Sequence, residues 1–281
     1  MTRRQWLAGA AAIGLGAPLG VGLYAWRVEP HWVAFRRRRM PIAQLPPRLA
    51  GKRLVQISDL HVGPIVDNAY LRGVLRRVAA LRPDYLAITG DLMTCEGPEQ
   101  LEPTLATLLE TLSIEDCHRV VVLGNHDYGM HFRQRRVAEA LADRLRDHDY
   151  HVLVNSVVTL DELQFAGTAD LWSRFCRVPD TLRDLSTDAP AICLSHNPDT
   201  VDRPGWEGYR GWILSGHTHG GQCRFPLVGA PVLPIRNARY CEGHVRLSGG
   251  RDLYVNRGIG YKRRVRFGVR PEVTEFTLTR A

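Results

Sequence analysis

Aspartate, asparagine and histidine recur beside glycine or serine in five short blocks of this 281-residue chain. In chain order the blocks are 58–61 (Ser-Asp-Leu-His), 90–91 (Gly-Asp), 124–127 (Gly-Asn-His-Asp), 195–197 (Ser-His-Asn) and 216–220 (Gly-His-Thr-His-Gly). Their carboxylate, amide and imidazole donors, without thiolate, suit borderline divalent ions such as Mn, Fe or Zn. The candidate ligands are Asp59, His61, Asp91, Asn125, His196, His217 and His219. They are too many for one tetrahedral metal ion and fit two cations bridged by a carboxylate, an arrangement used in phosphoryl-ester hydrolysis.

Each block follows a short apolar run that we predict to be a strand. In the first half of the chain such runs alternate with longer amphipathic ones, giving strands at 52–58, 85–89 and 119–123 and helices at 68–81, 103–112 and 132–146. This βαβαβα order predicts a layered α/β architecture in which functional groups gather at the carboxyl ends of parallel strands. One histidine after a strand is usually an ordinary hydrogen-bonded residue, so the inference rests on the recurrence of the blocks.

Two blocks place candidate ligands two residues apart. In an extended chain such residues point to the same side, so we expect Asp59 and His61 to face one centre, and His217 and His219 to do the same. The neighbouring glycines would let the backbone turn sharply and approach closely.

From about residue 150 onward short predicted strands dominate. They lie at 151–154, 156–160, 163–167, 191–194, 211–214, 241–247, 253–256 and 272–278. We therefore expect a second, mixed sheet packed on the first.

The blocks, taken together and in this order, resemble those of the calcineurin-like metallophosphoesterases, D-x-H, G-D, G-N-H-D, H and G-H-x-H, over residues 52 to about 280. The resemblance implies a four-layer α-β-β-α sandwich, with two mixed sheets flanked by helices and the metal site at strand carboxyl ends. It also implies two divalent metal ions. The first would be held by Asp59, His61 and His219, the second by Asn125, His196 and His217, and Asp91 would bridge them.

The same resemblance assigns roles to the rest of the third block. His126 would stabilise the transition state or protonate the leaving oxygen, and Asp127 would orient it. The implied reaction is in-line attack on phosphorus by a metal-bridging hydroxide whose pKa the cations lower. The chain would be a hydrolase acting on a phosphodiester or pyrophosphate bond. A phosphomonoesterase, a protein phosphatase and a non-catalytic, membrane-tethered metal-binding scaffold are the alternatives.

A looser resemblance concerns the sub-group. The N-terminal apolar segment, the extended 216–222 block and the 257–260 and 266–272 segments look like membrane-associated phosphoesterases, which include twin-arginine-exported phosphodiesterases and certain UDP-2,3-diacylglucosamine pyrophosphatases. A lipid-linked or nucleotide-containing substrate would follow from it.

Further residues are candidates for contact with substrate. Basic side chains that could neutralise its phosphates are Arg257, Arg264 and Arg266. An acyl-chain or nucleobase platform could be formed by Phe165, Trp172 and Phe175, although aromatic residues are more often core. His131 lies close enough to the third block to touch substrate, and Asp170 is either a supporting carboxylate or a turn residue. Among the histidines that fit no block are His118, His131, His148, His151 and His244.

The N-terminus predicts a location. Residues 6–26 are 21 residues without a charge, and Thr2-Arg3-Arg4 before them resembles a twin-arginine export signal. We expect a signal or membrane anchor over 1–30, a basic, Pro-containing linker over 31–50 and the metallophosphoesterase domain over 51–281. The catalytic domain would lie at an exported membrane face; the arginine run 36–39 favours the cytoplasmic face instead.

Charge and cysteine content exclude other classes. Residues 1–40 hold seven arginines against one glutamate, so they carry +6 of the formal +8. The remainder is nearly neutral, and we expect no nucleic-acid partner. The six cysteines are widely spaced without a C-x-x-C pair, which argues against a zinc knuckle or a dense disulfide scaffold.

Overall fold

Two six-stranded sheets form the centre of the protein. The computed structural model describes residues 18–94 and 98–281. The strand order of the first sheet is β1-β12-β2-β3-β4-β5, from Ala34–Ile42, Glu272–Arg280, Arg53–Ile57, Tyr85–Thr89, His118–Val122 and Tyr150–Leu153. The order of the second is β10-β11-β9-β8-β7-β6, from Gly243–Arg246, Arg251–Val255, Gly211–Ser215, Ala191–Leu194, Leu163–Gly167 and Ser156–Leu160. Both sheets are mixed, as predicted.

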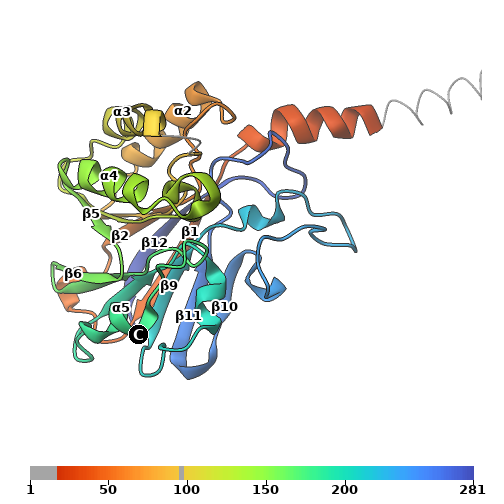
Figure 1. The fold of residues 1–281 in the computed structure, drawn as a ribbon. Coiled ribbons are helices and arrows are strands. Elements are labelled where there is room, and N and C mark those ends of the chain that lie inside the picture. The colour runs from red at the N-terminus through yellow and green to blue at the C-terminus, as the bar shows by residue number, and fades with distance from the viewer. Residues whose placement is uncertain (1–17, 95–97) are drawn as a thin grey trace, which may run out of the picture.

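Helices cover the outer faces of both sheets. Figure 1 shows α2 (Asn68–Ala80), α3 (Leu101–Thr111) and α4 (Arg135–Arg146) together on one side of the first sheet, and α5 (Val178–Arg183) contacts β6 and β7 of the second. The sequence of α2 shows why it packs there. Asp67 accepts a hydrogen bond from the backbone N–H of Tyr70 and caps the helix, and apolar residues at helical spacing are buried: Leu71, Val74, Leu75 and Val78.

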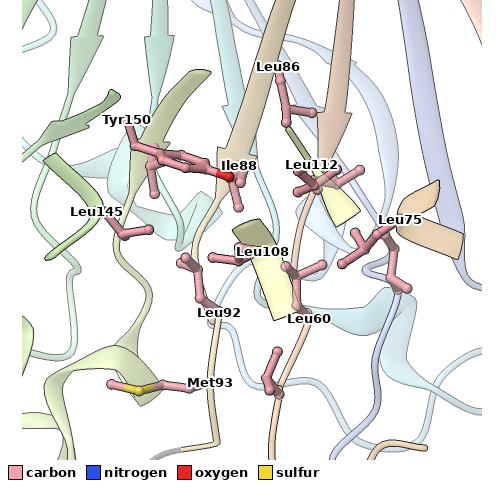
Figure 2. Close-up of a cluster of buried hydrophobic side chains, with 14 of the residues drawn as sticks. Leu60, Leu75, Leu86, Ile88, Leu92, Met93, Leu108, Leu112, Leu145 and Tyr150 are labelled. Atoms are coloured by element: carbon pink, nitrogen blue, oxygen red, sulfur yellow. The ribbon is translucent and has the colours of Figure 1, made fainter. Parts of the chain in front are cut away.

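Three apolar clusters separate the four layers. The largest lies between the first sheet and its helices, where strand residues such as Ile88 meet helix residues such as Leu75 and Leu108 (Figure 2). A second cluster, which includes Phe165 and Phe276, lies between the two sheets, and a third lies on the outer face of the second sheet. The predicted four-layer α-β-β-α sandwich is therefore confirmed.

The arginine run differs from its prediction. We expected a linker over residues 31–50, but Ala34–Ile42 forms β1, which pairs in parallel with β12 at the edge of the first sheet. The pairing uses backbone groups, and all four side chains of Arg36–Arg39 stay exposed, which an edge strand permits. Arg37 also forms an ion pair with Glu275 of β12, with 3.1 Å between Nε and Oε2.

The described part of the N-terminal segment is helical over residues 18–23 and continues through short helical turns at Tyr24–Val28 and Glu29–His31. Most of the predicted signal or anchor lies outside the described residues. Within residues 18–94 and 98–281, no helix has both the length and the apolar character needed to cross a membrane. The cysteines of this part of the chain are free thiols: Cys117, Cys176, Cys193, Cys223 and Cys241.

Parallel strands bring the five blocks to one end of the molecule. The neighbouring strands β2, β3 and β4 run in parallel, as do β8 and β9 of the second sheet. The polar blocks follow the last residues of these strands directly or, after β4, with one residue between. Groups that are more than 150 residues apart in sequence are thereby gathered at the strand carboxyl ends.

Candidate metal centre and active site

The seven predicted ligands lie together and are buried. Within residues 18–94 and 98–281, three sets of potential ligand atoms lie within 4.8 Å of one another: Asp59 with His61 and His219, His61 with Asp91 and His126, and Asp91 with His196 and His217. Asn125 joins the last set, because its Oδ1 lies 3.2 Å from Nε2 of His196. The side chains thus form two adjacent groups, and Asp91 lies between them.

Asp91 holds the central position. Its Oδ2 atom is 3.6 Å from Nε2 of His61 and 3.4 Å from Nε2 of His196, and it has no hydrogen-bond partner although it is buried. Its Oδ1 atom accepts a hydrogen bond of 2.9 Å from the backbone N–H of His126. A buried carboxylate oxygen without a partner is costly, so the site fits a positively charged ligand at this oxygen.

Backbone carbonyls orient two of the histidines. Nδ1 of His196 lies 2.7 Å from the carbonyl of Thr89, and Nε2 of His217 lies 3.0 Å from the carbonyl of Pro234. Because a carbonyl only accepts, these nitrogens carry the protons. The opposite nitrogens, Nε2 of His196 and Nδ1 of His217, lie 3.2 Å apart in the centre and are the atoms available to a cation.

The backbone at the ligands differs from the extended conformation that we expected. The φ angle is +52° at Asp59, +50° at His61, +52° at Asp91, +70° at His217 and +51° at His219. Left-handed backbone is costly for residues other than glycine and gathers at functional sites. Both two-residue spacings run through turns rather than through an extended strand, so the predicted conformation is wrong. Asp59 and His61 do meet in one set of potential ligand atoms, whereas His217 and His219 belong to different sets.

Glycine is required beside two of the ligands. A Cβ atom at Gly90 would lie 2.5 Å from Nδ1 of His196, and one at Gly216 would lie 2.5 Å from Oδ2 of Asp59. These distances are far below van der Waals contact, so the absence of a side chain lets the ligand blocks approach one another.

Burial and mutual charge set the protonation of the cluster. Burial raises the pKa of Asp59 to about 6 and lowers that of His61 to about 3, and it also holds the pKa values of His217 and His219 well below the usual range. Burial also acts to lower the pKa of His196, but the carboxylates around this ring outweigh burial and raise the pKa to about 10. Most of the imidazoles are therefore neutral, as metal ligation requires, and cation binding would displace a proton from His196.

His126 lies at the edge of this cluster. Its ring packs edge to face against that of His61, with 4.9 Å between centroids, and its Nε2 atom is buried without a hydrogen-bond partner. Burial lowers its pKa. A neutral imidazole with an unused nitrogen is suited to proton transfer.

Asp127 does not have the contacts that we expected. Its carboxylate accepts three backbone N–H hydrogen bonds, from Leu92 at 2.9 Å, Met93 at 3.1 Å and Gly124 at 2.8 Å. These bonds occupy both oxygens and include none to the imidazole of His126. Asp127 instead ties the loop after β4 to the loop after β3, so it positions the loops that carry Asn125 and Asp91.

Residues 52–221 match the family described as calcineurin-like phosphoesterase. This chain belongs to the calcineurin-like phosphoesterase family. It is 31% identical to the uncharacterized metallophosphoesterase YkuE of Bacillus subtilis over 99% of this chain and 98% of that protein. It is 29% identical to the phosphodiesterase YaeI of Escherichia coli, with 99% of each chain covered, and 28% identical to the UDP-2,3-diacylglucosamine pyrophosphatase LpxG of Chlamydia trachomatis, with 92% and 93% covered. The resemblance seen in the sequence is confirmed, and the protein is a metallophosphoesterase and a hydrolase.

Two of the three arginines expected at substrate phosphates are used elsewhere in this phosphoesterase. Arg266 is fully buried, and its guanidinium donates to the carbonyls of Arg257 at 2.9 Å and Gly260 at 2.7 Å. The side chain of Arg257 is paired with Glu272, with 2.5 Å between Nε and Oε2. Both arginines hold the 257–260 loop, whose Gly260 N–H donates to the carbonyl of Asp59. Arg264 lies near the N-terminal segment, with its guanidinium 5.8 Å from the ring centroid of Trp26.

Sequence reasoning missed Lys262. Its positive charge adds to the effect of burial in lowering the pKa values of the site histidines, namely His61, His126, His217 and His219. Its side chain is only half-buried, so solvent still reaches it. It escaped notice because it stands in a run of basic residues outside every block, and no spacing signal marks it.

Asp170 belongs to the surroundings of His196. Its Oδ2 atom accepts a hydrogen bond of 2.8 Å from the backbone N–H of Ser173, and its Oδ1 atom is buried without a partner. Burial raises its pKa to about 6, and its charge contributes to the raised pKa of His196. It is thus a supporting carboxylate as well as a turn residue.

A groove of about 930 Å³ lies beside the centre. Trp172 lines it and packs edge to face on His217, with 4.5 Å between ring centroids, and Phe132 lines it and packs on His126 at 5.0 Å. His131 is also in its wall. The charged residues of the lining are Arg133, Arg174, Arg203 and Arg236 together with Asp199 and Asp202.

The three aromatic residues considered as a platform separate in the structure. Phe165 is buried between the sheets, and Phe175 stacks on Tyr128 with 5.8 Å between ring centroids. Trp172 alone of the three lines the groove beside the ligands and is 37% exposed.

Proposed function

We propose that this phosphoesterase hydrolyses a phosphodiester or pyrophosphate bond with the help of two divalent cations, Mn, Fe or Zn. The observation that carries the proposal is the buried, unpartnered Oδ2 atom of Asp91 between two groups of potential ligands. A single carboxylate oxygen facing both groups is what a shared ligand needs.

The residues divide as follows in this proposal. One cation would be held by Asp59, His61 and His219, and the other by Asn125, His196 and His217, with Asp91 in common. Two bound cations would supply water activation and neutralisation of the charge that develops on the phosphoryl group. The chain itself fixes the donors: the carbonyls of Thr89 and Pro234 set the imidazole tautomers, and Asp127 holds the loops.

His126 is the proposed proton donor to the leaving oxygen; because burial keeps its free ring neutral, the ring must first take up a proton from solvent. Its Nε2 atom has no partner in the protein, and the ring is held between His61 and Phe132. Lys262 is placed to attract the negatively charged substrate, because its field reaches the same histidines.

The groove supports a substrate larger than a simple phosphate ester. Its four exposed arginines suit a second phosphate, and Trp172 offers a flat apolar surface for a base or an acyl chain. A lipid-linked or nucleotide-containing substrate, such as one of the UDP-2,3-diacylglucosamine type, fits this lining. The named relatives, a phosphodiesterase and a UDP-2,3-diacylglucosamine pyrophosphatase, support the same range.

The proposed location is a membrane face. Residues 1–30 would act as a twin-arginine-like signal or anchor, with the catalytic domain exported and the cytoplasmic face as the alternative. A reporter fused after Ala281 tests this, because its activity on one side of the membrane contradicts the other placement.

Metal analysis combined with an assay tests the reaction. Purified protein loaded with Mn should contain about two metal ions per chain and hydrolyse bis(p-nitrophenyl) phosphate. Asp91→Asn, which keeps the shape of the side chain, should lose both properties together. Active wild-type protein with less than one metal ion per chain would contradict the proposal, as would an Asp91→Asn variant that keeps its metal and its rate.

A further inference from the structure

Exposed apolar side chains gather on one side of the molecule. The large apolar residues that are well exposed within the described ranges are Leu19, Val21, Leu23, Trp26, Val28, Trp32, Ile65, Met130, Trp172, Phe225, Leu227, Val228 and Val232. Ten of these thirteen lie in two segments, 19–32 and 225–232. The other three follow ligand blocks or line the groove. A surface concentration of this kind marks an interaction site.

The second segment is a tight hairpin with an apolar tip. The backbone N–H groups of Phe225 and Gly229 each donate to the other's carbonyl at 2.9 Å. At the tip, Leu227 has a φ of +67° and is fully exposed, and Val228 is 74% exposed. A branched apolar residue held in left-handed backbone and pointed into water is doubly unfavourable for an isolated soluble domain. Burial of this tip against a partner would offset that cost.

The hairpin and the N-terminal helix are linked through one intervening strip. The N–H of Arg224 donates to the carbonyl of Phe267 at 2.7 Å, and the N–H of Arg266 donates to the carbonyl of Ala25 at 2.9 Å. The 264–268 strip therefore joins the base of the hairpin to the helix. Figure 1 shows the N-terminal helix and the loop that carries the hairpin projecting from the same side of the body.

The charge of these segments indicates what they face. Residues 18–33, 222–236 and 257–270 together hold nine basic residues, of which Arg257 and Arg266 are buried, and one acidic residue, Glu29, which is also buried. Basic side chains that reach solvent around the apolar ones include Arg27, Lys262, Arg263 and Arg264. An apolar surface surrounded by cations is complementary to the headgroup region of an anionic bilayer.

The hairpin is also close to the metal centre along the chain. It lies between the fifth ligand block and Pro234, whose carbonyl accepts the hydrogen bond from His217. A surface that binds through this hairpin would hold the mouth of the site and the groove near lipid.

We propose that the 225–232 hairpin inserts its apolar tip into the headgroup and acyl boundary of a bilayer that contains anionic lipid, beside the N-terminal helix. The hairpin is thus a second membrane contact, separate from the N-terminal segment. The inference rests on the proposed membrane-side function, but its experiments measure the contact of the hairpin alone with lipid.

Brominated lipids provide the test. Leu227→Trp, made in the full chain, should show emission that is quenched by vesicles of phosphatidylcholine and phosphatidylglycerol brominated in the acyl chains, beyond the quenching of the wild-type tryptophans. The matched control is Thr187→Trp, an exposed position on the opposite end of the molecule. Equal quenching in the two variants would overturn the proposal, whatever the N-terminal segment does.

Binding measurements supply a second readout. Leu227→Asp/Val228→Asp should weaken flotation with the same vesicles about tenfold, while Ala43→Asp/Thr187→Asp, which adds the same charge at the far end, should not. Unchanged flotation of the hairpin variant would count against the inference. A change in oligomeric state without lipid quenching would assign the hairpin to self-association and overturn it. Hydrolysis of a soluble aryl diester by the hairpin variant should stay normal, which separates failure of this inference from failure of the proposed reaction.

Discussion

The backbone N–H of His217 donates to both carboxylate oxygens of Asp59, at 3.1 and 3.0 Å. These residues belong to the first and last ligand blocks and are 158 positions apart. These hydrogen bonds join the loop after β9 of the second sheet to the loop after β2 of the first. Both proposed cation positions therefore depend on the packing of the two sheets. The hydrogen bonds also offset part of the cost of burying Asp59.

Replacement of His126 by Gln should slow the reaction without removing the metal. If His126 protonates the leaving oxygen, turnover of a poor leaving group such as phenol should fall about 10²- to 10⁴-fold, and that of p-nitrophenol much less, because it leaves without protonation. Rates with matched phenyl and p-nitrophenyl diesters, together with metal content, check this. Equal losses with both leaving groups would remove the assignment as proton donor.

Replacement of Asp127 by Asn should destabilise the protein. The amide would point an NH₂ group at a backbone N–H that now donates to the carboxylate, at a cost of about 1–3 kcal/mol in unfolding free energy. Denaturant unfolding measures the loss, with the exposed Asp188→Asn as the control. An unchanged stability would show that the three backbone hydrogen bonds contribute little.

The ion pair between Lys52 and Asp84 should make the free energy of unfolding depend on pH in the acid range. Burial acts to raise the pKa of Asp84, but hydrogen bonds from Lys52 Nζ and the backbone N–H of Arg53, both 2.7 Å, lower it overall. The stabilisation is therefore full above the unfolded pKa of about 4 and is lost as pH falls through the lower folded value. Asp84→Asn should be less stable than wild type by about 1 kcal/mol at neutral pH, and the gap should close in acid. Thermal unfolding of both proteins at about ten pH values between pH 2 and 7 checks this. A stability difference that persists in acid would contradict it.

Removal of groove arginines should affect large substrates selectively. Arg203→Ser/Arg236→Ser should raise KM for a pyrophosphate-containing substrate about tenfold and leave the hydrolysis of bis(p-nitrophenyl) phosphate unchanged. The control, Arg210→Ser/Arg280→Ser, removes two exposed arginines at the far end of the strands. A parallel loss on both substrates, or the same effect in the control, would mean that the groove does not bind the second phosphate.

Much of the fold could be predicted because local apolar runs coincide with strands. The predicted ranges of β3, β6, β7 and β8 match the structure residue for residue. The strand β1 was missed because its pairing with β12 depends on backbone hydrogen bonds at a sheet edge, while its four exposed arginines hide any strand pattern.

The site was predictable as a set of residues but not as a geometry. The blocks identify which side chains meet, since strand carboxyl ends converge. The left-handed backbone at Asp59 and His61 and the burial of Arg266 depend on contacts between distant segments. A sequence pattern of charges also cannot separate a guanidinium that faces substrate from one that holds carbonyls, as Arg266 does.

The position of β12 constrains how the protein is made. Glu272–Arg280 fills the place between β1 and β2, two strands that come from the first sixty residues. Until the ribosome has synthesised this late segment, a nascent chain holds both early strands with an open edge, which exposes it to misassembly. Completion of the first sheet therefore has to follow synthesis of residue 280.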